Sequence, residues 1–254
     1  MYKILANTIF LGKDVHFLPD CHSTNDIAFQ MVRQKKAQEG TVVICSNQTK
    51  GRGQRGNVWV SEPGKNLTLS LVLRPSFLDI TEQFQLNMCV SNGIREFLQE
   101  YVPDIKVKWP NDLVVPGEGK IGGILIENSV TSEGWEFAVV GIGLNINQEK
   151  FPLPFATSLK KLTGTEFDLG ELFRLLITRL EQKYIQLRKG KIKEIKTEYL
   201  NYLYSKGEWK NFGLGEDQIL GKILGIDSLG QLQIEMENGE ISTFGFKDIR
   251  LPLE

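Results

Sequence analysis

Residues 41–66, TVVICSNQTKGRGQRGNVWVSEPGKN, decide how this chain folds, because they join an apolar strand to a loop rich in glycine and cations. Residues 42–44 form an apolar run bounded by polar residues, as in a short buried strand. Glycines let backbone N–H groups approach a ligand closely, and guanidinium groups offer paired donors to carboxylate or phosphate oxygens. The loop therefore predicts a site for a small anion, built from Lys50, Gly51, Arg52, Gly53, Arg55 and Gly56.

Runs of glycine and arginine also occur in disordered RNA-binding segments and in plain surface loops, so the loop alone leaves these alternatives open. The residues that follow it favour a folded site. Pro63 and Gly64 mark a turn, and leucines then alternate through residues 67–73 as in a second strand. We expect a loop held between two core strands to belong to a folded binding site.

The composition is that of an ordinary globular protein. With 254 residues, 41% of them hydrophobic, the chain is long enough for one large domain and one small domain. Lysine and arginine number 30 against 31 acidic residues, so the formal net charge is −1. Because the overall field favours neither nucleic acid nor an anionic membrane, we expect no nucleic-acid and no membrane partner.

Cys21, Cys45 and Cys89 are widely spaced and include no CxxC pair. This spacing predicts buried free thiols, not a disulfide framework or a zinc site, and neither His16 nor His22 has a partner at metal-binding spacing. The first residues lack the pattern of a secretory signal, and no apolar run reaches membrane-spanning length. We therefore expect a cytoplasmic protein with no metal site made by the protein alone.

A second candidate binding element precedes the loop. Weak strand character extends to Phe17, and Pro19 is expected to end it. Ser23, Thr24 and Asn25 then precede apolar residues at helical spacing, so Ser23 or Thr24 is predicted to cap a helix. These residues are either a simple cap or, together with the backbone donors of the first turn, part of a ligand site.

The segment after the loop predicts a helix and an interrupted strand. An amphipathic pattern covers residues 79–101, and residues 105–115 form a strand interrupted by KWPND. Proline cannot donate to a sheet, and the two residues after it favour a turn. The interruption is therefore either a hairpin-like kink or a bend that places Lys108, Asn111 and Asp112 around a site.

Two later strands contain glycines. KIGGILIE, residues 120–127, places Lys120 just before Gly122 and Gly123, and in FAVVGIGLNIN, residues 137–147, Gly141 and Gly143 fall on one face. A lysine at the end of a strand is usually just an exposed charge. Glycine within a strand leaves room for a ligand or another backbone, so the two strands predict one shared pocket floor.

The C-terminal part predicts two helices followed by a change of architecture. Helical spacing covers residues 168–188 and 191–204. From residue 210 onward, short apolar segments alternate with glycines, as in a small β-barrel. We place the domain boundary just before this change, so that one domain covers residues 1–205 and a second covers residues 206–254.

Taken in order, STN, QTKGRGQRGNVW, KWPND, KIGGILIE and GIGLNIN resemble the motifs of the biotin–protein ligase family. Each motif is weak evidence, whereas the ordered set is specific. The motifs cover residues 23–147, and the layout of the chain extends the resemblance over nearly its whole length. The resemblance implies an α+β fold, in which a central mixed sheet with flanking helices, related to class II aminoacyl-tRNA synthetases, precedes a C-terminal SH3-like β-barrel.

The resemblance also implies the reaction and the site. Biotin and Mg-ATP give biotinoyl-5′-AMP and pyrophosphate, and biotin is then transferred to a lysine of a biotin carboxyl carrier protein, a part of acetyl-CoA carboxylase or a related carboxylase. Bringing a carboxylate against a phosphate requires fixed cations and Mg²⁺. By similarity, Lys120 and Arg52 are catalytic, Ser23, Thr24, Asn25, Gln48, Gly51, Arg52, Gly53, Gln54, Lys120 and Gly123 bind biotin, and Arg55, Trp59, Lys108, Asn111, Asp112 and Asn145 bind the nucleotide.

The chain departs from the family pattern in two places. Many members carry arginine at the position of Gln54, which predicts altered retention of the adenylate. Bifunctional relatives carry a helix-turn-helix domain before the ligase, whereas about twenty residues precede Ser23 here, so we expect no operator-binding role. Either a monomer or a homodimer agrees with the sequence.

Two rival functions were weighed. A lipoate–protein ligase or octanoyl transferase shares the fold superfamily and the carrier-lysine chemistry, but KWPND, GRGQRG and GIGLNIN argue against it. An RNA-binding module would use the Arg/Gly loop and the small barrel. The near-zero net charge and the lack of a basic face flanked by aromatic residues weaken that second possibility.

Overall fold

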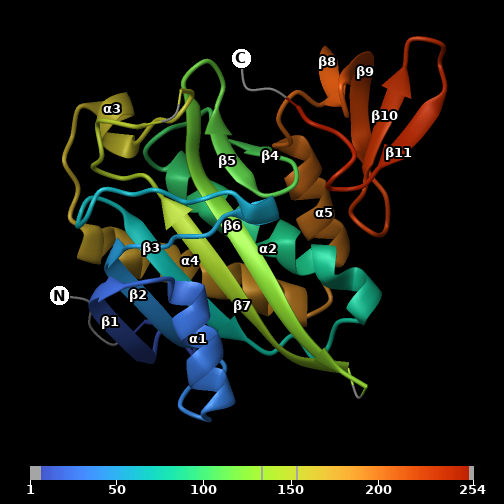
Figure 1. Ribbon diagram of the computed structural model, residues 1–254. Coiled ribbons are helices and arrows are strands. Elements are labelled where there is room, and N and C mark those ends of the chain that lie inside the picture. The colour runs from blue at the N-terminus through green and yellow to red at the C-terminus, as the bar shows by residue number, and fades with distance from the viewer. Residues whose placement is uncertain (1–6, 133, 153, 252–254) are drawn as a thin grey trace.

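The computed structural model describes residues 7–132, 134–152 and 154–251, and is built around a seven-stranded mixed sheet (Figure 1). The spatial order is β1-β2-β3-β7-β6-β5-β4, in which β1 and β2 are parallel and the other neighbours antiparallel. The first strand, part of the weak strand expected at the N-terminus, begins at Asp14; residues 1–6 lie outside the described part. The strands are β1 Asp14–Cys21, β2 Thr41–Gln48, β3 Leu67–Leu73, β4 Lys106–Lys108, β5 Asp112–Val115, β6 Gly119–Thr131 and β7 Gly134–Leu144.

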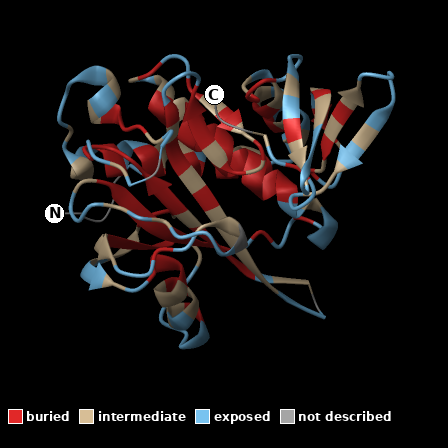
Figure 2. Cartoon of the chain, turned by 45° about the horizontal axis from the view of Figure 1, so that its top comes forward, coloured by how far each residue is buried: buried red, intermediate tan, exposed pale blue. Residues whose placement is uncertain are grey.

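Helices cover both faces of this sheet. Successive side chains of a strand point to opposite faces, so Val43 packs under α1 (Thr24–Arg33), whereas Val42 and Ile44 join the larger core on the other face. There α2 (Gln83–Gln99) packs against α4 (Leu169–Arg188) and α5 (Ile192–Asn201). Figure 2 shows the resulting band of buried residues along the strands and the helices behind them. The predicted helix-flanked mixed sheet is confirmed.

Two local predictions need correction. Pro19 does not end the first strand, because β1 is an edge strand with β2 as its one neighbour, and an edge tolerates a missing N–H. The short helix α3 (Leu159–Thr163) was not predicted, because five residues are too few to show a helical period. None of the helices in the described ranges is long and apolar enough to cross a membrane.

The C-terminal residues form a separate four-stranded antiparallel sheet, in the order β11-β10-β9-β8. Its strands are β8 Trp209–Leu214, β9 Asp217–Ile226, β10 Leu232–Met236 and β11 Ile241–Phe244. This small sheet is consistent with the predicted SH3-like barrel, and the predicted α+β class is confirmed. The exact domain boundary between residues 205 and 206 stays a prediction.

The small sheet docks beside the KWPND bend. The indole Nε1 of Trp109 donates to the carbonyl oxygen of Gly230 at 2.9 Å, and the Trp109 and Phe246 rings lie 5.3 Å apart between centroids. Phe84 of α2 stacks on Phe246 from the other side at 5.6 Å. The C-terminal part therefore packs on the bend and on α2 through an aromatic cluster.

Candidate functional site

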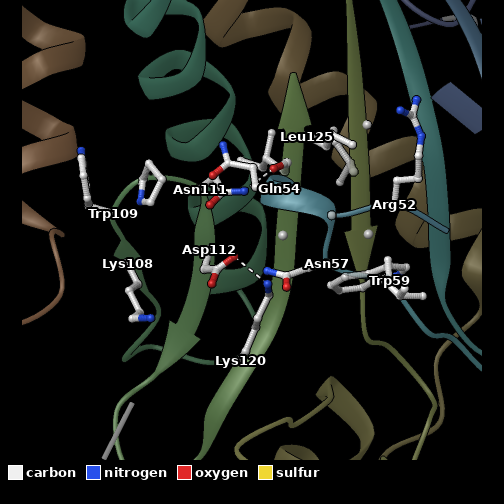
Figure 3. Close-up of a pocket in the computed structure, with 18 of the residues that line it drawn as sticks. Arg52, Gln54, Asn57, Trp59, Lys108, Trp109, Asn111, Asp112, Lys120 and Leu125 are labelled. Carbon is white, nitrogen blue, oxygen red and sulfur yellow. Dashed lines mark hydrogen bonds and ion pairs between the residues drawn. The ribbon is translucent and has the colours of Figure 1, made fainter. Parts of the chain in front are cut away.

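The main cavity, of about 970 Å³, lies between the 51–59 loop, the centre of the large sheet and the C-terminal sheet (Figure 3). Most of the residues predicted for the site meet there, although they come from separate parts of the sequence. The predicted residues that line the cavity are Ser23, Thr24, Asn25, Gln48, Arg52, Gly53, Gln54, Trp59, Lys108, Asn111, Asp112, Lys120 and Gly123.

The glycine strands form one floor, as predicted. Strands β6 and β7 pair Gly123 with Gly143, and Gly123, Gly141 and Gly143 all line the cavity. The room above two of these glycines is filled by side chains of the protein itself. A Cβ at Gly143 would lie 2.4 Å from the Trp59 ring, and one at Gly141 would lie 2.4 Å from Asn25 Oδ1. Because these glycines have no side chain, Trp59 and Asn25 can pack against them. The sequence alone did not predict this packing.

The glycine-rich loop is a closed hairpin. Gly53 N–H donates to the Asn57 carbonyl at 2.7 Å, and Trp59 N–H donates to the Gly51 carbonyl at 3.0 Å. Gly51 does not line the cavity; a Cβ there would lie 2.3 Å from the Trp59 carbonyl oxygen. The side chain of Arg55 lies outside what the structure describes. The expectation that the loop folds between two core strands is confirmed.

The end of the cavity near α1 is lined by uncharged polar side chains. Ser23 caps the helix, its Oγ accepting from the Asp26 N–H at 3.5 Å, and Thr24 N–H donates to Gln48 Oε1 at 2.8 Å. Because its oxygen is used in this way, Gln48 keeps its Nε2 donors for other partners. Ser23 is thus both the cap of α1 and a cavity residue, and Thr24, the first residue of the helix, also lines the cavity.

The buried hydroxyl of Ser70 limits which neighbouring atoms act as hydrogen-bond donors and which as acceptors. Ser70 Oγ lies 2.6 Å from Asn25 Oδ1 and 2.7 Å from Thr24 Oγ1, and Ser70 is fully buried. A hydroxyl has one proton, and an amide oxygen only accepts, so Ser70 donates to Asn25. Ser70 then has no proton left for Thr24, whose own proton goes either to Ser70 Oγ or to Gln48 Oε1 at 3.1 Å. Thr24 Oγ1 is left with a lone pair to offer as an acceptor.

Arg52 is paired with two carboxylates. Its Nη2 lies 2.5 Å from Asp26 Oδ1 and 2.8 Å from Glu127 Oε2, and its Nη1 lies 3.1 Å from Glu127 Oε1. In Figure 3 its guanidinium is turned away from Lys120 and Asp112. The side chain predicted to be catalytic is therefore ion-paired, and it lies beside the uncharged polar side chains near α1.

The opposite end carries cations. Lys120 Nζ lies 2.6 Å from Asp112 Oδ1, and the Lys120 ammonium lies 5.5 Å from the centre of the Trp59 ring. The half-buried Lys108 is opposite Asp112 in the β4–β5 hairpin. Burial lowers the pKa of Lys108, while the nearby Asp112 carboxylate opposes this shift and the Lys120 ammonium adds to it. Two ammonium groups against one carboxylate leave this end suited to an anion.

The KWPND segment is both a hairpin-like kink and a bend that places residues around the site. Strands β4 and β5 form the hairpin, and the bend also brings Lys108, Asn111 and Asp112 to the cavity. Asn111 Nδ2 donates to the Ile124 carbonyl, which ties the bend to β6. Asn145, predicted on the nucleotide side, does not line the cavity. Its Nδ2 donates to the Thr157 carbonyl at 3.0 Å and holds the segment beside Lys120, so a nucleotide role for Asn145 stays a prediction.

Several site residues were missed. The C-terminal sheet and the segment after it line one wall, with Asn211, Gln218 and Arg250 as its polar members, and no local pattern indicates this. Glu127 and Ser70 do have a signal, since each lies on the floor face of its strand by strict alternation. Phe155, also on the cavity wall, has a φ of +60°, which is uncommon for an aromatic residue.

The cysteines and the acidic groups make no metal centre in the part of the chain that the structure describes. All three thiols are free, with Cys45 and Cys89 buried and Cys21 half-buried. Burial raises the pKa of the Cys89 thiol, so it stays protonated and inert. The prediction of free thiols agrees with this arrangement.

Comparison with known proteins identifies the family. A model of the biotin/lipoate A/B protein ligase family matches residues 18–147, slightly more than half of the chain. The bifunctional ligase/repressor BirA of Bacillus subtilis is 28% identical over 238 residues, covering 91% of this chain and 72% of the relative. The biotin–[acetyl-CoA-carboxylase] ligase of Mycobacterium tuberculosis is 28% identical over 206 residues, covering 78% and 74%.

Solved structures agree with these matches. Biotin protein ligase from Aquifex aeolicus, in complex with biotin and ATP, superposes with a TM-score of 0.77 and 28% identity, covering 95% of this chain and all of that one. The biotin protein ligase of Leishmania major in complex with biotinyl-5-AMP, at 22% identity and a TM-score of 0.61, shares the fold over 91% of this chain. The ordered motifs, the mixed sheet with its small C-terminal sheet and these matches lead to one conclusion: this chain belongs to the biotin/lipoate A/B protein ligase family.

Proposed function

We propose that this protein is an ATP-dependent biotin–protein ligase. It activates biotin to biotinoyl-5′-AMP and transfers biotin to a lysine of a biotin carboxyl carrier domain, in acetyl-CoA carboxylase or a related carboxylase. The observation that carries this proposal is a single cavity with two different ends: a hydrogen-bonding end near α1, where Arg52 is ion-paired, and an end with two lysines. The names of the bacterial relatives and the Aquifex complex with biotin and ATP support the same assignment.

The uncharged end suits the bicyclic head of biotin. A ureido group carries N–H donors and one carbonyl acceptor, so it requires both acceptors and donors from the protein. Thr24 Oγ1 supplies an acceptor and Gln48 Nε2 supplies donors, with Ser23 beside them. No ammonium group lies among the described residues of this end, which is expected for a neutral ring system. Gly53 and Gln54 then cover biotin from the loop.

The cationic end suits the reaction between biotin and ATP. A biotin carboxylate oxygen attacks the α-phosphorus, a new O–P bond forms, and the bond to pyrophosphate breaks. Both reactants are anions, so the transition state needs positive charge already in place. Lys120 is the proposed catalytic cation, because it lies at this end next to Trp59. Lys108 at this end and Arg250 on the C-terminal wall of the cavity are assigned to the phosphates.

The residues present fit a Mg²⁺ ion that is held mainly by the nucleotide. Among the described residues that line the cavity, Asp112 is the one carboxylate. Mg²⁺ in such sites is usually held by one or two carboxylates together with substrate phosphates and water, so one carboxylate is sufficient. When bound, the ion would neutralise phosphate charge, and Asp112 would hold it while remaining paired with Lys120.

The second step uses the same cavity. The neutral amine of the carrier lysine attacks the carbonyl carbon of the adenylate, an amide bond forms, and AMP leaves. A mixed anhydride hydrolyses in open water, so the 51–59 loop and Trp59 are proposed to shield it until the carrier binds. A cytoplasmic location and a monomeric or homodimeric state are retained as proposals from the sequence.

Biotin-dependent exchange of labelled pyrophosphate into ATP tests this proposal. We expect exchange with biotin and not with lipoate or octanoate. Lys120→Ala should abolish it, because one of the two ammonium groups at the reacting end is removed. Exchange with lipoate or octanoate alone would assign the protein to the lipoate branch of the family, and exchange with none of the three acids would refute the adenylation chemistry.

A further inference from the structure

Glu127 lies on β6, outside the cavity lining, yet its carboxylate contacts two residues of the cavity wall. Oε1 accepts from Arg52 Nη1 at 3.1 Å, and Oε2 accepts from Arg52 Nη2 at 2.8 Å and from Asn25 Nδ2 at 2.7 Å. The pair with Arg52 is bidentate, the geometry in which an arginine is most precisely oriented. One carboxylate therefore joins the loop, the helix α1 and the central strand.

The contact with Arg52 holds the whole loop. Arg52 forms a β-bridge with Val58, and the hairpin between them is closed by backbone hydrogen bonds. The hairpin is therefore held together by its own backbone, and Trp59 follows it directly. Anchoring the Arg52 side chain to β6 keeps this unit over the glycine floor. Asp26 adds a second anchor from α1 at 2.5 Å.

The contact with Asn25 fixes the direction of an amide. A carboxylate only accepts, so Asn25 must turn its NH₂ group towards Glu127 and its oxygen towards Ser70. Ser70, which gives its proton to Asn25, can then only accept from the Thr24 hydroxyl. The donor and acceptor pattern that the cavity offers at this end therefore begins at Glu127.

We propose that Glu127 is a positioning residue for biotin, which acts through Arg52 and Asn25. It holds the 51–59 loop in place over the biotin end and sets the hydrogen-bond polarity of that end, without touching the ligand. The identity of the ligand rests on the proposed function. Arg52, by this proposal, contributes to binding as the loop's anchor, and the catalytic charge comes from Lys120 at the other end of the cavity.

Glu127→Gln is the variant that tests the proposal, because it keeps size and shape while it replaces one acceptor oxygen with a donor. If the new NH₂ group takes the place of Oε1, Arg52 Nη1 loses its acceptor, and if it takes the place of Oε2, both Arg52 Nη2 and Asn25 lose theirs. Hydrogen bonds to charged groups are strong enough that we expect the biotin KM to rise about ten- to hundredfold, with a smaller change in kcat. In the ligand-free protein, trypsin should cleave the loop at Lys50 or Arg52 several times faster.

Two further variants separate positioning from general stability. Glu136→Gln removes a carboxylate from the neighbouring strand β7, where it accepts from Ser129 at 2.6 Å, far along the hairpin from the site, and should leave KM and cleavage unchanged. In an Arg52→Gln background, Glu127→Gln should raise the biotin KM much less than it does alone, because part of its effect passes through Arg52.

The proposal is supported if biotin KM and loop cleavage rise in Glu127→Gln while the melting temperature stays at the wild-type value. It is wrong if Glu127→Gln behaves like Glu136→Gln, or if its kinetic change is matched by a general loss of stability. If the wild type shows no biotin-dependent exchange, the proposed function fails, and cleavage of the ligand-free loop still decides whether Glu127 holds it.

Discussion

Replacing Gly143 with alanine tests whether the glycine floor exists to admit Trp59. The added Cβ would lie 2.4, 2.6 and 2.8 Å from three atoms of the indole. Ordinary contacts begin at 3.4 Å, so the ring must move by about 1 Å. Overpacking of this kind costs about 1–3 kcal/mol, and alanine at a glycine recovers up to about 1 kcal/mol through the unfolded state.

Gly225→Ala is the matched control, because it brings the same gain through the unfolded state without the overpacking. The difference between the two variants is therefore the cost of overpacking alone. Gly225 is also in a strand, β9, and the nearest atom to its added Cβ is Leu200 Cδ2 at 3.7 Å, an ordinary contact. Gly143→Ala should therefore be about 1–3 kcal/mol less stable than Gly225→Ala, which for a chain of this size lowers the melting temperature by several degrees.

The catalytic effect should be larger than the effect on stability. Displacing a residue next to the reacting groups by about 1 Å is enough to cost about a hundredfold in rate. Pyrophosphate exchange should fall accordingly in Gly143→Ala and stay near wild type in Gly225→Ala. In a Trp59→Ala background, Gly143→Ala should cost nothing further in stability. Equal melting temperatures and equal exchange for the two alanine variants would refute the reasoning.

Two other changes at the site have expected outcomes. Lys108→Met should stabilise the ligand-free protein at neutral pH and weaken ATP binding. Burial lowers the pKa of Lys108. Between the lowered pKa and the ordinary one, the folded state therefore binds fewer protons than the unfolded state. The free-energy cost of burying the charged lysine falls as the pH rises through that range. Melting curves across the alkaline range check this, and a gain that is constant with pH contradicts it. Gln54→Arg should slow release of the adenylate many-fold and leave biotin affinity unchanged, because Gln54 lines the cavity from the loop. Chasing labelled adenylate with unlabelled adenylate measures the release rate. An unchanged release rate would mean that Gln54 causes no deficit in retention.

The sequence by itself determined the elements and much of the site. Apolar alternation, helical spacing and turn residues are local, and they placed the two core strands around the loop, the cap at Ser23 and the glycine strands correctly. Alternation along a strand also indicates which residues share a face. The floor was predicted from Gly122, Gly123, Gly141 and Gly143, and all of these except Gly122, whose open side faces Leu144, line the cavity.

Only the tertiary structure decided what fills and encloses that site. The order β3-β7-β6 brings Ser70, Gly141 and Leu125 into one row, and the docking of the C-terminal sheet through Trp109 adds Arg250 to the opposite wall. The pairing of Arg52 with Asp26 and Glu127 joins a loop, a helix and a strand. A period in the sequence shows the face on which a residue lies, whereas the partner it meets depends on strand order and register, which arise from contacts between distant segments.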